Sequence, residues 1–275
     1  MDPQCQPHIT VARAGLAVLV VLAVSATGRE YSLEYGFGLP EQAGYLQTPA
    51  GGMPGTASSK RPTLAEIDLD GGGYRWLGAR VDFGPNARIH RAAPFHLRLY
   101  ARHTTIGDDA TSMVTEAFTI RGGVFEAGDS VRCEVAFDSL TLALTAAFDL
   151  RAGLSVELGP EIVWTAFDFG MTGERHQSDR AYHVTTFGLV GEISKELGNG
   201  WHIGVRFAAS PAIEGTGSRY AAETRAGLDL SKNLRVAVGA SIEAFRYDDA
   251  HKQVLPNRLK VTRRIVPTAS VRLRL

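Results

Sequence analysis

The segment WHIGVRFAAS, residues 201–210, decides the fold because its side chains alternate strictly in character. Apolar residues, beginning with Trp201, occupy the odd positions, and small or polar residues occupy most of the even positions. Residues 220–230 and 234–242 repeat this alternation. A period of two residues is typical of a β-strand. The sequence therefore predicts three consecutive strands in this part of the chain.

These alternating stretches are longer than the strands of a soluble sandwich. Each runs for about 9 to 11 residues, whereas strands in soluble proteins usually have about 5 or 6. A tilted strand of about 9 to 11 residues crosses a bilayer, with apolar side chains facing lipid and polar ones facing the lumen. We therefore predict an all-β fold, a transmembrane antiparallel up-and-down β-barrel. A secreted β-sandwich is the alternative fold.

The N-terminal residues predict export from the cytoplasm. Arg13 precedes an apolar run that ends in small residues, which is the pattern of a cleaved signal peptide. We expect cleavage after Ala26, which leaves residues 27–275 as a single barrel domain. The net charge is +0, so nothing indicates nucleic-acid binding. In the mature chain Cys133 stands alone among apolar residues of the same parity, and we interpret it as a small apolar filler and not as a nucleophile.

Twelve strands are predicted along the mature chain, with ten or eight as the alternatives. They are residues 31–39, 63–70, 74–83, 95–102, 114–120, 131–150, 154–169, 183–195, 201–210, 220–230, 234–242 and 259–275. Within 131–150 the apolar parity changes from odd to even, which predicts a β-bulge near Asp138 and Ser139. The residues before that bulge would pair with residues 118–125 in a hairpin above the outer surface.

The predicted connections alternate in length around the barrel. The short ones are 71–73, 107–111, 151–153, 196–200 and 231–233. Bacterial barrels have short periplasmic turns and longer external loops, so both termini should lie in the periplasm. Aromatic residues near strand ends predict the two interfacial girdles. We assign Trp76, Phe148 and Trp201 to the periplasmic girdle and Trp164 and Tyr220 to the outer one.

Two features resemble outer-membrane proteins of Gram-negative-type bacteria. The last strand alternates strictly to an outward apolar residue, as in the C-terminal signal that the barrel assembly machinery recognises, although Leu275 stands where Phe is usual. Residues 61–66, RPTLAE, and the block 122–150 are similar to uncharacterised outer-membrane β-barrel proteins. The resemblance implies a location in the outer membrane, with outer-membrane lipid and the assembly machinery as partners.

Charged side chains on the inward parity predict the lining of the lumen. The acids are Glu34, Glu66, Asp68, Asp82, Glu157, Glu161, Glu223 and Glu243, and the bases are Arg80, Arg98, Arg102, Arg206, Arg225, Arg235, Arg264 and Arg272. An unpaired charge in a narrow lumen would be costly, so the two signs should interlock in a network. We expect a narrow, weakly conducting or closed lumen, and a role as a structural barrel or a small-solute channel.

Two other functions stay open, a surface-interaction (adhesin-like) barrel and a lipid-active enzyme. Glu157 and Glu161 share one strand face, but four residues place them about 13 Å apart, too far for a glycosidase pair. His96, His183 and His202 have no metal-ligand spacing. We therefore predict that the protein is not an enzyme and has no catalytic residue, metal or cofactor.

Overall fold

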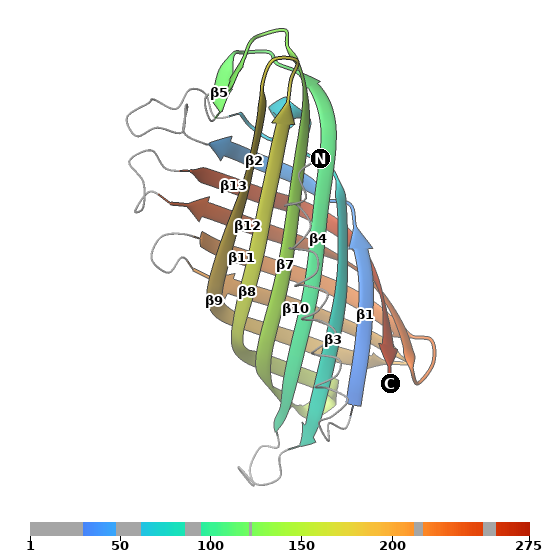
Figure 1. Cartoon of the computed structure of the whole chain (residues 1–275). Coiled ribbons are helices and arrows are strands. Elements are labelled where there is room, and N and C mark those ends of the chain that lie inside the picture. Colours follow the sequence, from blue (N-terminus) through green and yellow to red (C-terminus); the bar gives the residue numbers. More distant parts are fainter. Residues whose placement is uncertain (1–29, 48–61, 86–94, 121–122, 212–216, 250–256) are drawn as a thin grey trace.

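The computed structural model describes residues 30–47, 62–85, 95–120, 123–211, 217–249 and 257–275. The predicted signal peptide lies outside these residues. The described chain forms one antiparallel sheet that closes on itself, because β13 pairs back with β1 (Figure 1). Ten strands make the closed ring, which confirms the barrel as the fold class and ten as the strand number, whereas the preferred number of twelve is wrong. The secreted sandwich is excluded by the same closure. No helix in the described ranges is long and apolar enough to cross a membrane.

The ring follows the order of the chain. Its strands are β1 (Glu30–Gly38), β3 (Gly73–Pro85), β4 (Phe95–Met113), β7 (Ser130–Asp149), β8 (Leu154–Thr172), β9 (Gln177–Gly198), β10 (Trp201–Ser210), β11 (Gly217–Asp229), β12 (Leu234–Asp248) and β13 (Arg258–Arg274). A further strand, β2 (Glu41–Gln47), continues β1 along the first part of β13. A separate hairpin joins β5 (Phe118–Ile120) to β6 (Gly123–Phe125).

Two predicted strands are absent from the ring for identifiable reasons. Residues 63–70 contain the short 3-10 helix η3 (Ala65–Ile67) instead of a strand. The Glu66 carboxylate accepts hydrogen bonds from the backbone N–H of Thr63 at 2.8 Å and from its hydroxyl at 2.9 Å, and that hydroxyl accepts the N–H of Glu66 at 3.2 Å. This reciprocal capping box favours a helical turn. Of residues 114–120, only β5 is a strand, and it belongs to the small hairpin.

The predicted bulge near Asp138 and Ser139 does not exist. The β4–β7 pairing runs from Phe95 opposite Phe148 to Met113 opposite Ser130 with no register shift. Odd-numbered β7 side chains face the interior along the whole strand. What changes is their chemistry, from threonine and alanine near one end to valine and phenylalanine near the other.

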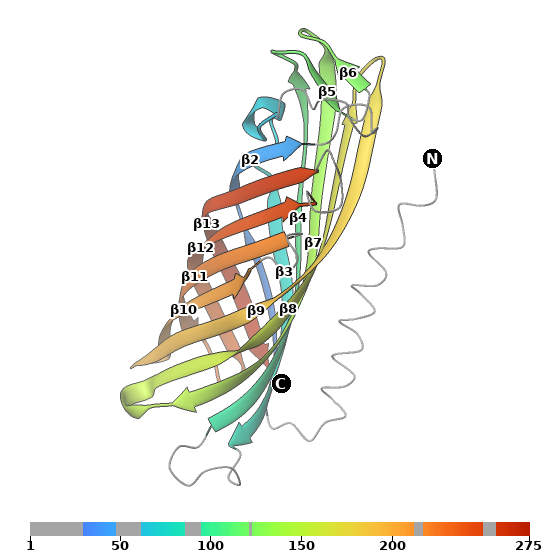
Figure 2. The same cartoon turned by 90° about the vertical axis from the view of Figure 1, so that its left-hand side faces the viewer.

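One wall of the barrel is much taller than the other. β4, β7, β8 and β9 have 19 to 22 residues, whereas β10 has 10. At about 3.3 Å per residue the longer strands measure roughly 65 Å. Their upper parts rise beyond the ends of the other strands and carry the β5–β6 hairpin, as Figures 1 and 2 show. We call these upper parts the tall wall.

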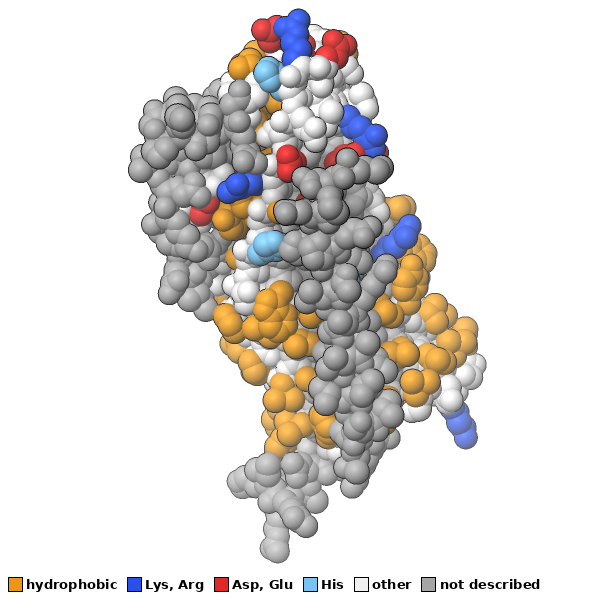
Figure 3. All heavy atoms as spheres, in the orientation of Figure 1, with side chains coloured by type: hydrophobic (Ala, Val, Ile, Leu, Met, Phe, Trp, Pro, Cys, Tyr) orange, Lys and Arg blue, Asp and Glu red, His pale blue; other side chains and the backbone are white. Residues whose placement is uncertain are grey.

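The two ends of the barrel differ. We call the end that holds the start of β1 and the end of β13 the base, and the opposite end the crown. The short connection η4 (Arg151–Gly153) and the turns at 199–200 and 230–233 lie at the base. Two predicted short connections are wrong: residues 107–111 continue β4, and Gly71 and Gly72 precede β3 at the crown. Figure 3 shows hydrophobic side chains over the half nearer the base and charged ones at the crown.

Candidate functional site in the barrel interior

A hydrophobic core fills the interior at the crown. Phe137 and Phe167 lie with ring centroids 4.6 Å apart, and Phe245 reaches Phe137 from across the barrel at 6.2 Å. Residues from two connections complete this crown core, namely Leu64, Ile67 and Leu69 around η3 and Phe118, Ile120 and Phe125 in the hairpin. These connections thus pack on the inner face of the tall wall, where their apolar side chains are buried.

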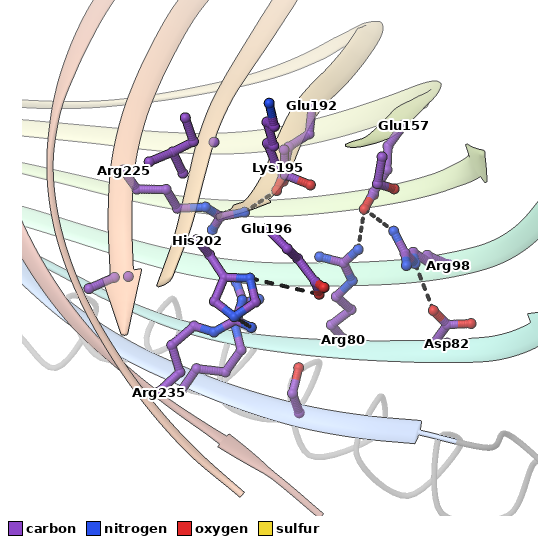
Figure 4. Close-up of a pocket in the computed structure, with 18 of the residues that line it drawn as sticks. Arg80, Asp82, Arg98, Glu157, Glu192, Lys195, Glu196, His202, Arg225 and Arg235 are labelled. Atoms are coloured by element: carbon purple, nitrogen blue, oxygen red, sulfur yellow. Dashed lines mark hydrogen bonds and ion pairs between the residues drawn. The ribbon is translucent and has the colours of Figure 1, made fainter. Parts of the chain in front are cut away.

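Below the crown core, ion pairs cross the interior. The Glu157 carboxylate accepts hydrogen bonds from Arg80 and Arg98, and Arg98 also donates through Nε to Asp82 at 2.7 Å (Figure 4). These residues come from β3, β4 and β8, so the pairs tie together strands that are not all adjacent. Thr145 Oγ1 donates to the second Glu157 oxygen at 3.2 Å.

A second set of ion pairs spans the other side of the interior. Arg272 donates through Nε to Glu34 at 3.1 Å, which links the last strand to the first where the barrel closes. Arg225 on β11 pairs with Glu192 and lies 3.9 Å from the Glu34 carboxylate. Each guanidinium therefore lies beside a carboxylate, as burial of charge requires.

The third set lies directly beneath the crown core. Glu243 accepts from Arg219 at 3.0 Å and lies 3.3 Å from Arg263, while Arg219 lies 3.6 Å from Glu161. Aromatic rings take part at this level, since the guanidinium of Arg263 lies 4.7 Å from the ring centre of Phe137. The same kind of stacking occurs for Arg102 over Trp76 at 4.6 Å and Arg206 over Tyr100 at 4.1 Å.

Most of the predicted lumen residues lie inside the barrel, with three exceptions. Those inside are Glu34, Arg80, Asp82, Arg98, Arg102, Glu157, Glu161, Arg206, Glu223, Arg225 and Glu243, together with Arg235 and Arg272. Glu66 and Asp68 are instead exposed beside η3 at the crown. Arg264 is exposed on the outer surface, because the β12–β13 register shifts by one residue and turns Arg263 inward.

The predicted set lacks several inward charges, among them Glu192, Arg219 and Arg263. Glu192 had a visible signal, because it alternates with the outward Leu189 and Ile193 in β9. Arg219 shares the parity of Glu223 and Arg225 but lies before the predicted strand begins. Only Arg263 depends on a bulge that the sequence pattern hides.

The predicted girdle residues lie in different places. Trp76 is not in a girdle: it faces the interior, is 3% exposed and lies at the crown half of β3. Its ring covers Gly36 so closely that a Cβ at Gly36 would lie 2.0 Å from it. Phe148 and Trp201 are exposed near the base, and Trp164 and Tyr220 are exposed at the crown side of the outward apolar residues.

A polar cavity of about 510 Å³ lies between the ion pairs and the base. Both signs of charge line it, including Glu157, Glu192, Arg225 and Arg235 (Figure 4). At its rim, the Asp229 carboxylate accepts from Arg235 Nε at 2.6 Å and lies 2.8 Å from His202 Nε2. Acidic and basic side chains line the cavity in equal numbers, so neither sign of charge dominates its lining.

The histidines that the sequence singles out lie apart from one another. His96 pairs with Asp82 at 3.2 Å, whereas His183 lies on the outer face of the tall wall. Within the described residues no group of three His, Cys, Asp or Glu side chains could hold a metal ion. Cys133 is buried in the crown core, and burial raises the pKa of its thiol to about 11.

No protein-family model and no curated protein sequence matches this chain. Among solved structures, the translocator domain of the autotransporter NalP from Neisseria meningitidis is 11% identical, with 100% of both chains covered and a TM-score of 0.40. The outer membrane protease OmpT from Escherichia coli is 10% identical, with 89% of this chain and 97% of that chain covered and a TM-score of 0.39. The attachment invasion locus protein Ail of Yersinia pestis is 11% identical, with 91% and 100% covered and a TM-score of 0.34.

Likenesses of this size carry no argument about the present chain, so its class rests on its own geometry. That geometry is a ten-stranded, antiparallel, up-and-down barrel with apolar side chains outward and charged side chains inward. This combination is the one that defines transmembrane β-barrels.

Proposed function

We propose that the chain is an integral outer-membrane β-barrel with a closed lumen, and that its crown presents a protein surface outside the cell. The outward apolar residues support the membrane part of the proposal. On β7 they run over residues 140–148, on β8 over 154–164 and on β10 over 201–209. Stretches of about 9 to 11 residues match the hydrocarbon thickness of a bilayer.

The crown core is the observation that carries the closed lumen. A conducting path along the axis would have to pass between aromatic rings that meet from opposite walls, such as Phe137 on β7 and Phe245 on β12, whose centroids lie 6.2 Å apart. It would then have to separate ion pairs such as Arg98 with Asp82. Separating such pairs would leave charges without partners in the interior, which disfavours opening.

The tall wall supports a role in surface interaction. Its outward side chains are polar, including Asp109, Arg132 and Glu134, so this part of the barrel suits water and not lipid. A polar sheet that stands above the membrane on a closed barrel offers a rigid surface to other molecules. We propose surface presentation as the role, and we expect no catalytic activity.

A narrow small-solute channel is the second candidate, and the basal cavity favours it. The cavity already provides a polar entrance of about 510 Å³ at the base. For transport, the residues around η3 and the β5–β6 hairpin would have to leave the crown core. The channel therefore requires a second conformation, which the surface role does not.

Planar-bilayer recording separates the two candidates. The refolded barrel should first show heat-modifiable migration in a detergent gel, with a β-rich circular dichroism spectrum. We then expect no stable conductance. Large, stable conductance from folded protein would refute the closed lumen, and a soluble monomer that needs no detergent would refute the membrane proposal itself.

A further inference from the structure

The outer surface beside β12 and β13 carries an unusual group of cations. Arg246 on β12 and Arg258, Lys260 and Arg264 on β13 all face outward. Arg246, Lys260 and Arg264 are exposed, and Arg258 is partly so. We call these four residues the basic strip.

The strip brings like charges together. Arg246 and Lys260 lie directly opposite each other in the β12–β13 pairing. Like charges at directly opposed positions destabilise a sheet unless something neutralises them. Asp248 does so only in part, since its single Oδ2 accepts from both Arg246 and Arg258 at 3.1 Å. Glu41 on β2 lies directly opposite Arg264 in the sheet, but within the described chain neither Lys260 nor Arg264 forms an ion pair.

The basic strip lies next to the crown-side limit of the outward apolar residues. Arg264 adjoins Ile265, which is 73% exposed, and Ile242 on β12 is exposed at the same level. These residues form the crown-side limit of the outward apolar stretch, and Lys260 lies four residues, about 13 Å along the strand, beyond Arg264. A strip of cations directly above lipid-facing residues lies at the depth of lipid headgroups.

The tall wall carries carboxylates at the corresponding height. Its outward residues above the apolar stretch include Asp138, Glu134 and Asp109. The exposed cation of β7, Arg132, lies beside two of these carboxylates, whereas two of the four cations of the basic strip share the carboxylate of Asp248. Anionic headgroups should gather on one side only.

We propose that the basic strip binds the phosphate groups of anionic lipids in the outer leaflet. This inference rests on the proposed membrane location. The guanidinium groups of Arg246 and Arg264 and the ammonium of Lys260 would donate to phosphate oxygens, which are strong acceptors for charged donors. The bound phosphate would relieve the repulsion between Arg246 and Lys260.

Native mass spectrometry in a neutral detergent tests the proposal with two lipid probes, phosphatidylglycerol and phosphatidylcholine. We expect the folded barrel to bind phosphatidylglycerol more tightly. Each cation near an anionic headgroup contributes enough for about a five-fold change in affinity. Lys260→Gln and Arg264→Gln should therefore each weaken phosphatidylglycerol binding about five-fold, with little change for phosphatidylcholine.

The matched control is Arg132→Gln on the tall wall. Its side chain is 60% exposed, close to the 65% of Arg246, and it pairs with Glu134 at 2.9 Å. It should leave both lipid affinities unchanged. Lys260→Arg keeps the positive charge and should retain the preference for phosphatidylglycerol. This variant therefore separates the loss of charge from a folding defect caused by substitution at this position.

Three outcomes would overturn the proposal. One is an unchanged preference in both glutamine variants while heat-modifiable migration shows that they are folded. Another is an equal loss of phosphatidylglycerol affinity in Arg132→Gln. The third is displacement of the lipid by inorganic phosphate at the same concentration, which would mean that the strip takes free phosphate. None of these results would affect the membrane proposal, whose test is integration and heat-modifiable migration.

Discussion

Glu157→Gln is the sharpest test of the interior ion pairs. Glu157 accepts from Arg80 and Arg98, and its side chain is 9% exposed. A glutamine keeps the shape but removes the negative charge. Arg98 would retain Asp82 at 2.7 Å, whereas Arg80 would lose the one carboxylate that lies within 4 Å of it among the described residues.

The size of the effect follows from that asymmetry. Loss of one partner from a buried pair costs roughly 3 to 5 kcal/mol. The Arg80 side chain is 19% exposed and borders the polar cavity, so water recovers part of that loss. We expect the free energy of unfolding to fall by about 2 to 3 kcal/mol. For a domain of this size this is equivalent to a decrease of roughly 5 to 10 °C in melting temperature.

The assay is urea unfolding of the detergent-solubilised barrel, followed by heat-modifiable gel migration. The double variant Arg80→Met with Glu157→Gln should recover most of the loss, because it leaves no uncompensated charge. Glu134→Gln on the tall wall is the control, since an exposed pair contributes about 0 to 1 kcal/mol. A Glu157→Gln barrel within about 0.5 kcal/mol of the parent, or no recovery in the double variant, would refute the reasoning.

Three further predictions concern the crown core and the β7 strand. The Cys133 thiol can be followed alone at pH 8 in a Cys5→Ser chain, which has no other cysteine. It should react with a thiol reagent at least about 100-fold more slowly in the folded protein than in urea, because its pKa of about 11 leaves little thiolate. Comparable rates in the two states would contradict its burial. Phe167→Ala should lower the free energy of unfolding by about 3 to 5 kcal/mol in the same urea assay, and a loss below 1 kcal/mol would mean that the crown core is loosely packed. Residues 144 and 134 both face outward on β7. A cysteine in the Leu144→Cys variant should therefore label only with a lipid-soluble maleimide, and one in the Glu134→Cys variant only with a water-soluble maleimide. A bulge between the two positions would turn one side chain inward and leave it unlabelled.

Sequence alternation was sufficient to place most of the interior charges. The inward direction of Glu34, Arg80 and Glu157 follows from a period of two, which depends only on neighbours in the chain. Errors came from features that alternation does not encode. Arg264 was assigned inward because the one-residue shift near Ser241 on β12 leaves no trace in the apolar pattern.

One wrong strand had consequences for other assignments. Counting residues 63–70 as a membrane strand placed Gly71 to Gly73 at the periplasmic end, and it placed Trp76 in the girdle there. The Thr63 and Glu66 capping box shows why that segment turns instead. With the strand removed, β3 starts at the crown, and Trp76 lies inside the barrel on the same parity as Arg80.

The absent bulge in β7 has a more general explanation. A change of apolar parity can arise from an extra residue or from a change of surroundings along a regular strand. A bulge would be local to one strand, but here the outward chemistry changes on four. The changes fall at His103, Leu140, Trp164 and Thr185, and each of these residues is the direct cross-strand neighbour of the next. One row across the sheet therefore marks the level at which lipid gives way to water outside and ion pairs give way to the crown core inside. A side chain at Asp138 faces outward just as Leu144 does, and only the medium that it meets has changed.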